Sequence, residues 1–239
     1  MIDLSADLGE GSPGEDELWP LITRANVACG GHVGDEQSMR AAAALAKKHD
    51  VILGAHPSYP DRANFGRKSI DITREALRAS LTAQIVSLHA IAPLHHVKPH
   101  GALYNEAHKN LALANVIVDA MRDVDANLAM VAPDGSQMAA AARAAGMRVI
   151  REAFADRRYE PDGSLTPRGI EGSTLAVDEA AAQAALLVTE GTVIARDGTR
   201  IPIAFDTLCI HADMPGAIDR LHAIHVSMTG HGLHERCCK

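Results

Sequence analysis

The chain has 239 residues, of which 47% are hydrophobic, 22% charged and 3% aromatic, and its formal net charge at pH 7 is −7. This acidic balance argues against nucleic-acid binding, because neutralising phosphates requires clustered Lys and Arg, and the few aromatic side chains argue against a surface for stacking bases. We expect neither a membrane anchor nor a signal peptide, because no apolar stretch approaches roughly 18 residues and no basic segment precedes an apolar one at the amino terminus.

Short apolar runs typical of strands alternate with helical patterns along the whole chain. We expect strands at 1–4, 22–27, 51–53, 92–97, 128–131, from 149 onward and at 207–210. Helices are expected after the N-cap Asp35 and after Ser136, the latter ending at Gly146. Apolar residues at helical spacing predict four more helices, at 73–90, 111–121, 178–190 and 216–228.

Two long loops and one hairpin interrupt this alternation. Residues 55–68 and 156–172 are polar, contain glycine or proline, and are long enough to be functional loops. A hairpin is expected at 192–203 around Asp197-Gly198, which is a favoured two-residue turn.

Seven strands alternating with helices, without a repeat or a linker, predict one α/β domain over 1–239. The choice is between a doubly wound sheet and a closed or nearly closed (β/α) barrel. We favour the barrel of about seven strands, because polar residues follow many different strands, whereas an open sheet concentrates its site at one crevice.

Histidines recur where the expected strands end. His100 follows a strand that Pro99 must stop, because proline cannot donate to a sheet ladder. His32, His56 and His211 stand at similar positions after three other strands. In a barrel these ends meet on one face, so we expect the four histidines to converge.

Other polar residues accompany the histidines at the strand ends. Histidine and carboxylate supply general acids and bases, while lysine and arginine bind a carboxylate or a developing oxyanion, a combination that suits hydrolysis of an amide-like bond in a small acidic molecule. The candidate catalytic residues are Asp7, Glu10, His32, His56, His100, Asp156 and His211. The candidate substrate-binding residues are Asp35, Lys98, Tyr104, Asn105, Arg157, Arg168 and Asp213.

Simpler interpretations remain open for some of them. Asp35 also fits a plain helix cap, Glu10 a ligand of turn amides, and Asp156 with Arg157 a surface ion pair. Asp7, His32 and His56 together fit a divalent metal site, although no His-x-x-x-His or His-Glu-x-x-His spacing supports one.

Neither a phosphate-binding loop nor a cysteine framework is present in the sequence. The segment 66–69, Gly-Arg-Lys-Ser, lacks the upstream glycine of a phosphate loop, and no dinucleotide-binding glycine pattern follows a strand. The four cysteines have no zinc-finger or disulfide spacing, and we expect a cytoplasmic protein.

Several ordered motifs together resemble the LamB/YcsF family, whose characterised members are the A subunit of the bacterial ATP-dependent 5-oxoprolinase. The resemblance extends from the first strand to His211. It is carried by 3–11 (Asp-Leu-Ser-Ala-Asp-Leu-Gly-Glu-Gly), 26–35 (Asn-Val-Ala-Cys-Gly-Gly-His-Val-Gly-Asp), 54–61, 65–67, 97–105, 152–157 with Tyr159, and 162–165 with Arg168.

The resemblance implies a (β/α) barrel of the glycoside hydrolase/deacetylase type. It also implies cleavage of 5-oxoproline to L-glutamate coupled to ATP hydrolysis, in a complex with two other subunits. We expect those partners to bind ATP and activate the ring carbonyl, while Lys98 or Arg168 binds the lactam carboxylate here. Asp7, His32, His56 or His100 is then expected to direct water.

Three residues depart from the family pattern. Ser5 replaces the usual Asn, Gly31 a Phe, and Ala212 a Gly. The first two are expected close to the pocket, where they alter the fit of the substrate.

Two further functions remain open on the sequence alone. One is a metal-dependent deacetylase of N-acetylated sugars, which would need a divalent ion and no ATP. The other is a non-catalytic subunit that only holds substrate for its partners.

Overall fold

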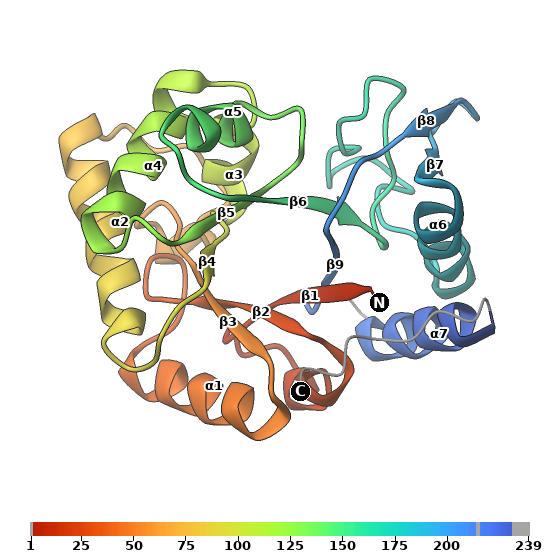
Figure 1. Ribbon diagram of the computed structural model, residues 1–239, viewed down its shortest axis with the longest axis horizontal. Coiled ribbons are helices and arrows are strands. Elements are labelled where there is room, and N and C mark those ends of the chain that lie inside the picture. Colours follow the sequence, from red (N-terminus) through yellow and green to blue (C-terminus); the bar gives the residue numbers. More distant parts are fainter. Residues whose placement is uncertain (1, 214–215, 231–239) are drawn as a thin grey trace.

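Seven parallel strands close into a barrel in the computed structural model, which describes residues 2–213 and 216–230 (Figure 1). Around the barrel they follow the order β1 (Asp3–Leu8), β2 (Arg24–Ala28), β3 (Ile52–His56), β4 (His96–Val97), β5 (Ala129–Ala132), β6 (Val149–Phe154) and β9 (Thr207–His211). The pairing of β1 with β9, with Asp7 opposite His211, closes the ring. The expected seven-stranded barrel is therefore confirmed, and the doubly wound sheet is excluded.

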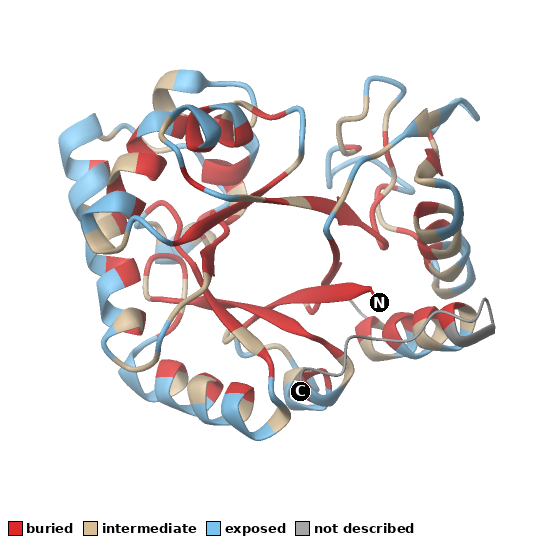
Figure 2. Ribbon diagram, viewed as in Figure 1, coloured by how far each residue is buried: buried red, intermediate tan, exposed pale blue. Residues whose placement is uncertain are grey.

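Helices cover the outside of the barrel, and their inner faces are buried while their outer faces are exposed (Figure 2). They are α1 (Glu36–His49), α2 (Arg74–His89), α3 (Gly101–Ala107), α4 (Leu111–Val124), α5 (Gln137–Ala144), α6 (Val177–Glu190) and α7 (Ala217–Gly230), with short 3₁₀ turns η1 (Glu15–Glu17), η2 (Trp19–Leu21) and η3 (Arg62–Asn64). The expected hairpin forms as β7 (Thr192–Ile194) and β8 (Arg200–Pro202), outside the barrel. Within the described ranges, no helix has both the length and the apolar character that crossing a membrane requires.

Side-chain caps start the helices where the sequence predicts them. Asp35 forms a capping box with Ser38, and the side chains of Thr73 and Ser136 each accept a hydrogen bond from a backbone amide of the first turn. These bonds satisfy amide groups that have no partner within the helix. Short polar residues in front of apolar periodicity are therefore a reliable signal in this chain.

The segment after β4 differs from the expectation. Strand β4 ends at Val97, just before Pro99, but the chain then forms helix α3, which the sequence pattern does not predict. Gly101 has φ of 57°, and a Cβ on it would lie 2.5 Å from the carbonyl oxygen of Gly66. That oxygen accepts a hydrogen bond of 2.9 Å from the amide of Ala102, so a distant loop fixes the start of α3.

The first strand is longer than the sequence indicates. Strand β1 runs on to Leu8 and includes Asp7, for which the glycine-containing segment around it predicts a turn. The expectation that Met1 begins this strand lies outside the described residues. Because Asp7 belongs to β1, its position is fixed by the backbone pairing of β1 with β2 on one side and with β9 on the other.

The inside of the barrel holds a connected set of buried polar side chains. Asp3 accepts hydrogen bonds of 3.0 and 2.6 Å from Arg24, whose Nη1 lies 3.1 Å from Nδ1 of His96. His96 Nε2 lies 2.8 Å from Oδ1 of Asn26, and the Asn26 amide donates to Asp7 at 2.9 Å. Buried polar groups are stable when they are hydrogen-bonded to one another, as these are. The network therefore fixes the orientation of the Asp7 side chain from inside the barrel.

Candidate active site

A cavity of about 1100 Å³ opens where the barrel strands end. Its walls come from the segments after β1, β3, β4, β5, β6, β8 and β9, which are far apart in sequence. Most of the residues expected from the sequence line it: Asp7, Glu10, His56, Lys98, His100, Tyr104, Asn105, Arg157, Arg168, His211 and Asp213. The carboxyl ends of the strands therefore collect polar groups on one face, as barrel enzymes do.

Lys98 is buried between two carboxylates. Its Nζ lies 2.9 Å from Oδ1 of Asp7, 2.8 Å from Oε1 of Glu152 and 3.1 Å from Sγ of Cys209. The Tyr104 hydroxyl donates to the other Glu152 oxygen at 2.7 Å. The ammonium group is thus held at a fixed point of the cavity wall by its neighbours.

The charges of this group support one another. Burial opposes ionisation of Asp7, but His56 and Lys98 outweigh it and hold the pKa of Asp7 well below its usual value. Burial likewise opposes the charge of Lys98, yet Asp7, Cys209 and Glu152 raise the pKa of Lys98 well above its usual value. Lys98 is therefore a permanent cation, suited to stabilising negative charge that develops on a substrate oxygen.

His211 on the cavity wall and the fully buried Asp156 form a second unit. The buried Asp156 carboxylate accepts from the His211 backbone amide at 2.9 Å and lies 3.0 Å from Nδ1 of its ring. Burial acts to raise the pKa of Asp156, but His211 outweighs it and lowers that pKa, so the ionised carboxylate only accepts. Nδ1 of His211 consequently carries hydrogen, and in the neutral ring Nε2 carries the lone pair. This is the arrangement of a general base with an orienting carboxylate.

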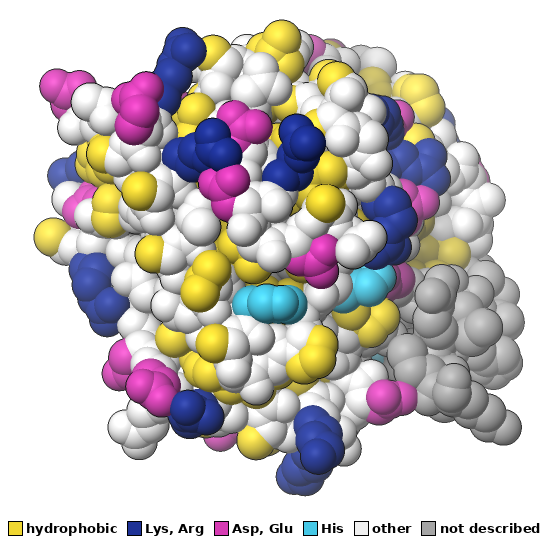
Figure 3. All heavy atoms as spheres, turned by 60° about the vertical axis from the view of Figure 1, so that its left-hand side comes forward, with side chains coloured by type: hydrophobic (Ala, Val, Ile, Leu, Met, Phe, Trp, Pro, Cys, Tyr) yellow, Lys and Arg dark blue, Asp and Glu magenta, His cyan; other side chains and the backbone are white. Residues whose placement is uncertain are grey.

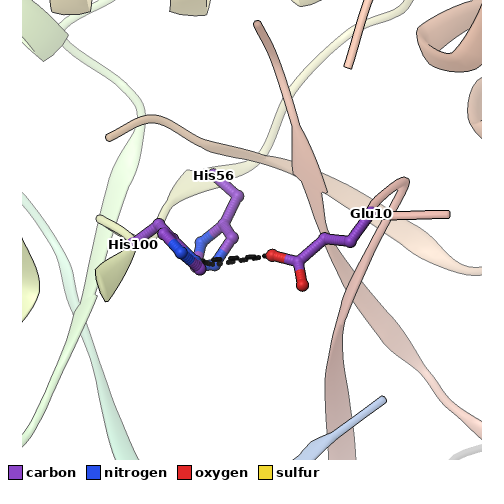
Figure 4. Close-up of side chains that lie close together, drawn as sticks. All are labelled: Glu10, His56 and His100. Carbon is purple, nitrogen blue, oxygen red and sulfur yellow. Dashed lines mark hydrogen bonds and ion pairs between the residues drawn. The ribbon is translucent and has the colours of Figure 1, made fainter. Parts of the chain in front are cut away.

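Glu10, His56 and His100 form a third unit, in which the side chains point toward one another (Figure 4). Nε2 of His56 lies 3.0 Å from Nδ1 of His100, and Oε1 of Glu10 lies 3.9 and 3.4 Å from these two nitrogens. Among the described residues these three form the group whose possible metal-ligand atoms all lie within 4.8 Å of one another. The trio expected from the sequence, Asp7, His32 and His56, is not grouped in this way.

His32 supports this unit from behind without lining the cavity. Its ring stacks on that of His100 with centroids 3.7 Å apart, and its Nε2 lies 3.0 Å from Oε1 of Glu10. Burial lowers the pKa of His32 and of His100 to about 4, so both rings are neutral at pH 7. Burial, reinforced by Asp7, raises the pKa of Glu10 to about 7 despite the opposing effect of His100.

Two arginines meet one carboxylate at the side of the cavity. Arg67 donates to Oδ2 of Asp213, and Arg168 lies 3.4 Å from the same oxygen. Burial opposes ionisation of Asp213, but Arg168, His211 and Arg67 lower its pKa. Two guanidinium groups thus lie at this side of the cavity, and guanidinium groups bind anionic substrates well.

The side chain of Arg157 is bound to the long loop that follows β6. It lines the cavity, but its guanidinium donates to the carbonyl oxygens of Ser173 at 3.1 Å and Thr166 at 2.6 Å. These bonds hold the long loop after β6 in place. The expected surface ion pair between Asp156 and Arg157 is not what the two side chains form, because both are buried and bonded to other partners.

Asp35 lies apart from the cavity, exposed at the start of α1. Its Oδ1 accepts from the Ser38 amide at 2.8 Å, which is the capping role. We expect Asp35→Ala to lower the free energy of unfolding by about 1 kcal/mol, while kcat and KM stay unchanged. Denaturant unfolding and steady-state kinetics of the same preparation check this, and a raised KM would return Asp35 to the substrate site.

Sequence reasoning missed several polar residues around the site. Glu152, which binds Lys98, is absent from the expected set, as are Asn26, His96 and Arg24 behind Asp7. The signal that could have found Arg24 and Asn26 is the alternation of polar and apolar residues in β2, since side chains two apart on a strand share one face. Polar residues on the inner face mean a hydrogen-bonded barrel interior, in place of the usual branched aliphatic layers.

The three departures from the family pattern also lie away from the cavity lining. Ser5 and Gly31 are buried and are not among the residues that line the cavity. A Cβ on Gly31 would lie 2.3 Å from Oε1 of Gln84 and 2.5 Å from Oγ of Ser58, so these side chains fill the space of a larger residue. Ala212 is buried directly after β9.

The outer surface shows mixed charge. On the described part of the face drawn in Figure 3, basic and acidic side chains are interspersed and do not form a basic stripe. Sustained contact with a nucleic-acid backbone would need such a stripe.

Comparison with known proteins identifies a family and several relatives that resemble this chain. A family model described as "LamB/YcsF family" matches residues 2–238. Proteins named as the A subunit of 5-oxoprolinase are 46% identical in Methylococcus capsulatus, covering 97% of this chain and 94% of that protein, and 42% identical in Neisseria meningitidis serogroup A, covering 98% of both. The crystal structure of a lactam utilization protein from Thermus thermophilus superposes with a TM-score of 0.91 at 39% identity, covering 98% of each chain.

Proposed function

The chain belongs to the LamB/YcsF family, and we therefore propose that it acts as the A subunit of a 5-oxoprolinase, opening the lactam of 5-oxo-L-proline to give L-glutamate. The observation that carries the proposal is the cavity, where a buried cation, a histidine base with its carboxylate, and two arginines face one space. These are the groups that hydrolysis of an anionic cyclic amide requires. The relatives that share almost the whole chain bear the name of that activity.

Each unit of the site has one part in the reaction. His211 Nε2 takes a proton from water as the water oxygen bonds to the ring carbonyl carbon. The ring C–N bond then breaks and the ring nitrogen takes up this proton from His211, while the second proton of the water passes from the new carboxyl group to the amine, so an ammonium group and a carboxylate result. Lys98 faces the carbonyl oxygen and stabilises its developing negative charge, and Asp156 keeps His211 in the required tautomer.

ATP use belongs to the complex in this proposal. Opening a stable lactam in water is unfavourable enough to need coupling, and we place ATP binding and hydrolysis on two partner subunits. The relatives are named as one lettered subunit of 5-oxoprolinase, which supports an assembly of several chains. Since ATP is a cytoplasmic substrate, we place the complex in the cytoplasm.

Arg168 and Arg67 are the proposed contacts of the lactam carboxylate. We expect Arg168→Gln to raise KM for 5-oxoproline about tenfold with a smaller change in kcat, because a partly exposed charge-assisted bond contributes modestly to binding. Steady-state kinetics of the reconstituted complex measures this. Arg78→Gln on α2 is the matched control, because Arg78 pairs with Asp123 and neither residue lines the cavity. An unchanged KM in Arg168→Gln would move carboxylate recognition elsewhere.

Reconstitution tests the proposed function. Glutamate release from 5-oxoproline is measured with ATP for this chain alone, for the partner subunits alone, and for the full mixture. We expect turnover only in the full mixture. Turnover without this chain would contradict the proposal, and ATP-independent release of acetate from an N-acetylated sugar would favour the deacetylase instead.

A further inference from the structure

The cluster of Glu10, His56 and His100 has a hydrogen-bonding pattern that the reaction described above does not explain. His56 Nδ1 lies 2.7 Å from the carbonyl oxygen of Lys98, and His100 Nε2 lies 3.0 Å from that of Phe65. A carbonyl oxygen only accepts, so each of these nitrogens must carry hydrogen. The backbone thus fixes the tautomer of both neutral rings.

The remaining nitrogens face each other with nothing to donate. His56 Nε2 and His100 Nδ1 each carry a lone pair in the neutral rings, and they lie 3.0 Å apart. Oε1 of Glu10 also carries only lone pairs when the carboxylate is ionised. It lies 3.4 Å from His100 Nδ1 and 3.9 Å from His56 Nε2. Three electron-rich atoms converging inside a protein repel one another unless a cation lies between them.

The spacing of these atoms fits a transition-metal ion. The point equidistant from all three lies about 2.0 Å from each, which is the bond length of zinc to His nitrogen and carboxylate oxygen. A single shared proton would bridge only two of the three atoms, whereas an ion at this point contacts all three. We propose that Glu10, His56 and His100 form a binding site for one divalent transition-metal ion of the zinc class.

The surroundings are those of a built site. The other nitrogen of each histidine is held by a backbone carbonyl, and His32 contacts the Glu10 oxygen at 3.0 Å. Such bonds orient metal ligands and fix their tautomers. The closely stacked ring of His32 restricts His100 to one orientation.

The site is open on one side, because all three residues line the cavity. Three protein ligands with an open position distinguish catalytic from structural zinc sites. Bound there, the ion supplies Lewis-acid chemistry beside the space assigned to the lactam carbonyl. This role rests on the proposed function, whereas binding of the ion does not.

Binding to the isolated full-length chain tests the site without ATP, lactam or partners. Protein stripped with a chelator is titrated with Zn²⁺ by calorimetry and with Co²⁺, whose visible absorption reports the ligand set. We expect one equivalent to bind. Glu10→Gln and His100→Ala are each expected to weaken binding about 100-fold or more, because each removes one of three ligands.

His211→Gln is the matched control, since His211 lies on the same cavity but outside the cluster. It should bind metal as the unaltered chain does, and circular dichroism of each variant verifies folding. Failure of the unaltered folded chain to bind one equivalent would overturn the proposal, as would unchanged affinity in folded Glu10→Gln. Metal binding without 5-oxoprolinase turnover would refute only the proposed function. Turnover by a chain that binds no metal would refute only this inference.

Discussion

Replacing Lys98 by Met is expected to lower kcat about 100- to 1,000-fold, which is the loss measured when one group that stabilises a developing oxyanion is removed. The Lys98 ammonium is fixed by Asp7 and Glu152 before substrate arrives. It therefore needs no reorganisation when charge develops on the carbonyl oxygen. Because both carboxylates already balance its charge, we expect its effect on kcat to exceed its effect on KM.

Folding must be separated from catalysis in this experiment. Lys98→Met leaves two carboxylates buried without their cation, which typically costs about 3–5 kcal/mol of stability. The double variant Lys98→Met with Glu152→Gln removes one of these charges and keeps the test possible if the single variant unfolds. Lys47→Met, at an exposed position of α1, is the control. A folded Lys98→Met complex with normal kcat and raised KM would make Lys98 a clamp for bound substrate.

Loss of the His211 base is expected to lower kcat about 100- to 10,000-fold. Asp156→Asn should lower kcat with little change in KM, because it disturbs the tautomer of His211 and not the binding of substrate. The two residues act as one unit, so His211→Ala combined with Asp156→Asn should lose no more than His211→Ala alone.

The double-mutant cycle distinguishes positioning from support of the fold. Both single variants and the double variant are measured in the reconstituted complex, with His222→Ala on the exposed face of α7 as control. Losses that simply multiply in the double variant would show that Asp156 does not act through His211.

The course of the chain is largely predictable because local chemistry marks it. Strand β4 ends two residues before Pro99, and the caps Asp35, Thr73 and Ser136 start three helices. The alternation of strands and helices predicts an α/β fold, and the polar residues after many different strands favour the barrel over a doubly wound sheet. Helix α3 is not predictable, since its start depends on contact between Gly101 and Gly66 across two loops.

The position of the site can be predicted from the sequence, but the contacts between its side chains cannot. A histidine after a strand is visible in sequence, and three of the four expected ones line the cavity. The contacts between individual side-chain atoms depend on how the barrel closes. His32 thus lies behind His100, Arg157 is bound to backbone carbonyls, and Glu152 is the partner of Lys98. Long-range pairing of this kind leaves no local pattern in one sequence.

Simultaneous measurement of glutamate and ADP in the reconstituted mixture tests the central claim, that lactam opening takes place in the cavity of this chain. With the unaltered chain we predict ATP-dependent glutamate release at saturating 5-oxoproline. With folded His211→Ala assembled into the same complex, we predict at least a 100-fold slower release. Glutamate release at the full rate with His211→Ala would contradict the account, because the chemistry would then reside on a partner and this chain would only hold the substrate.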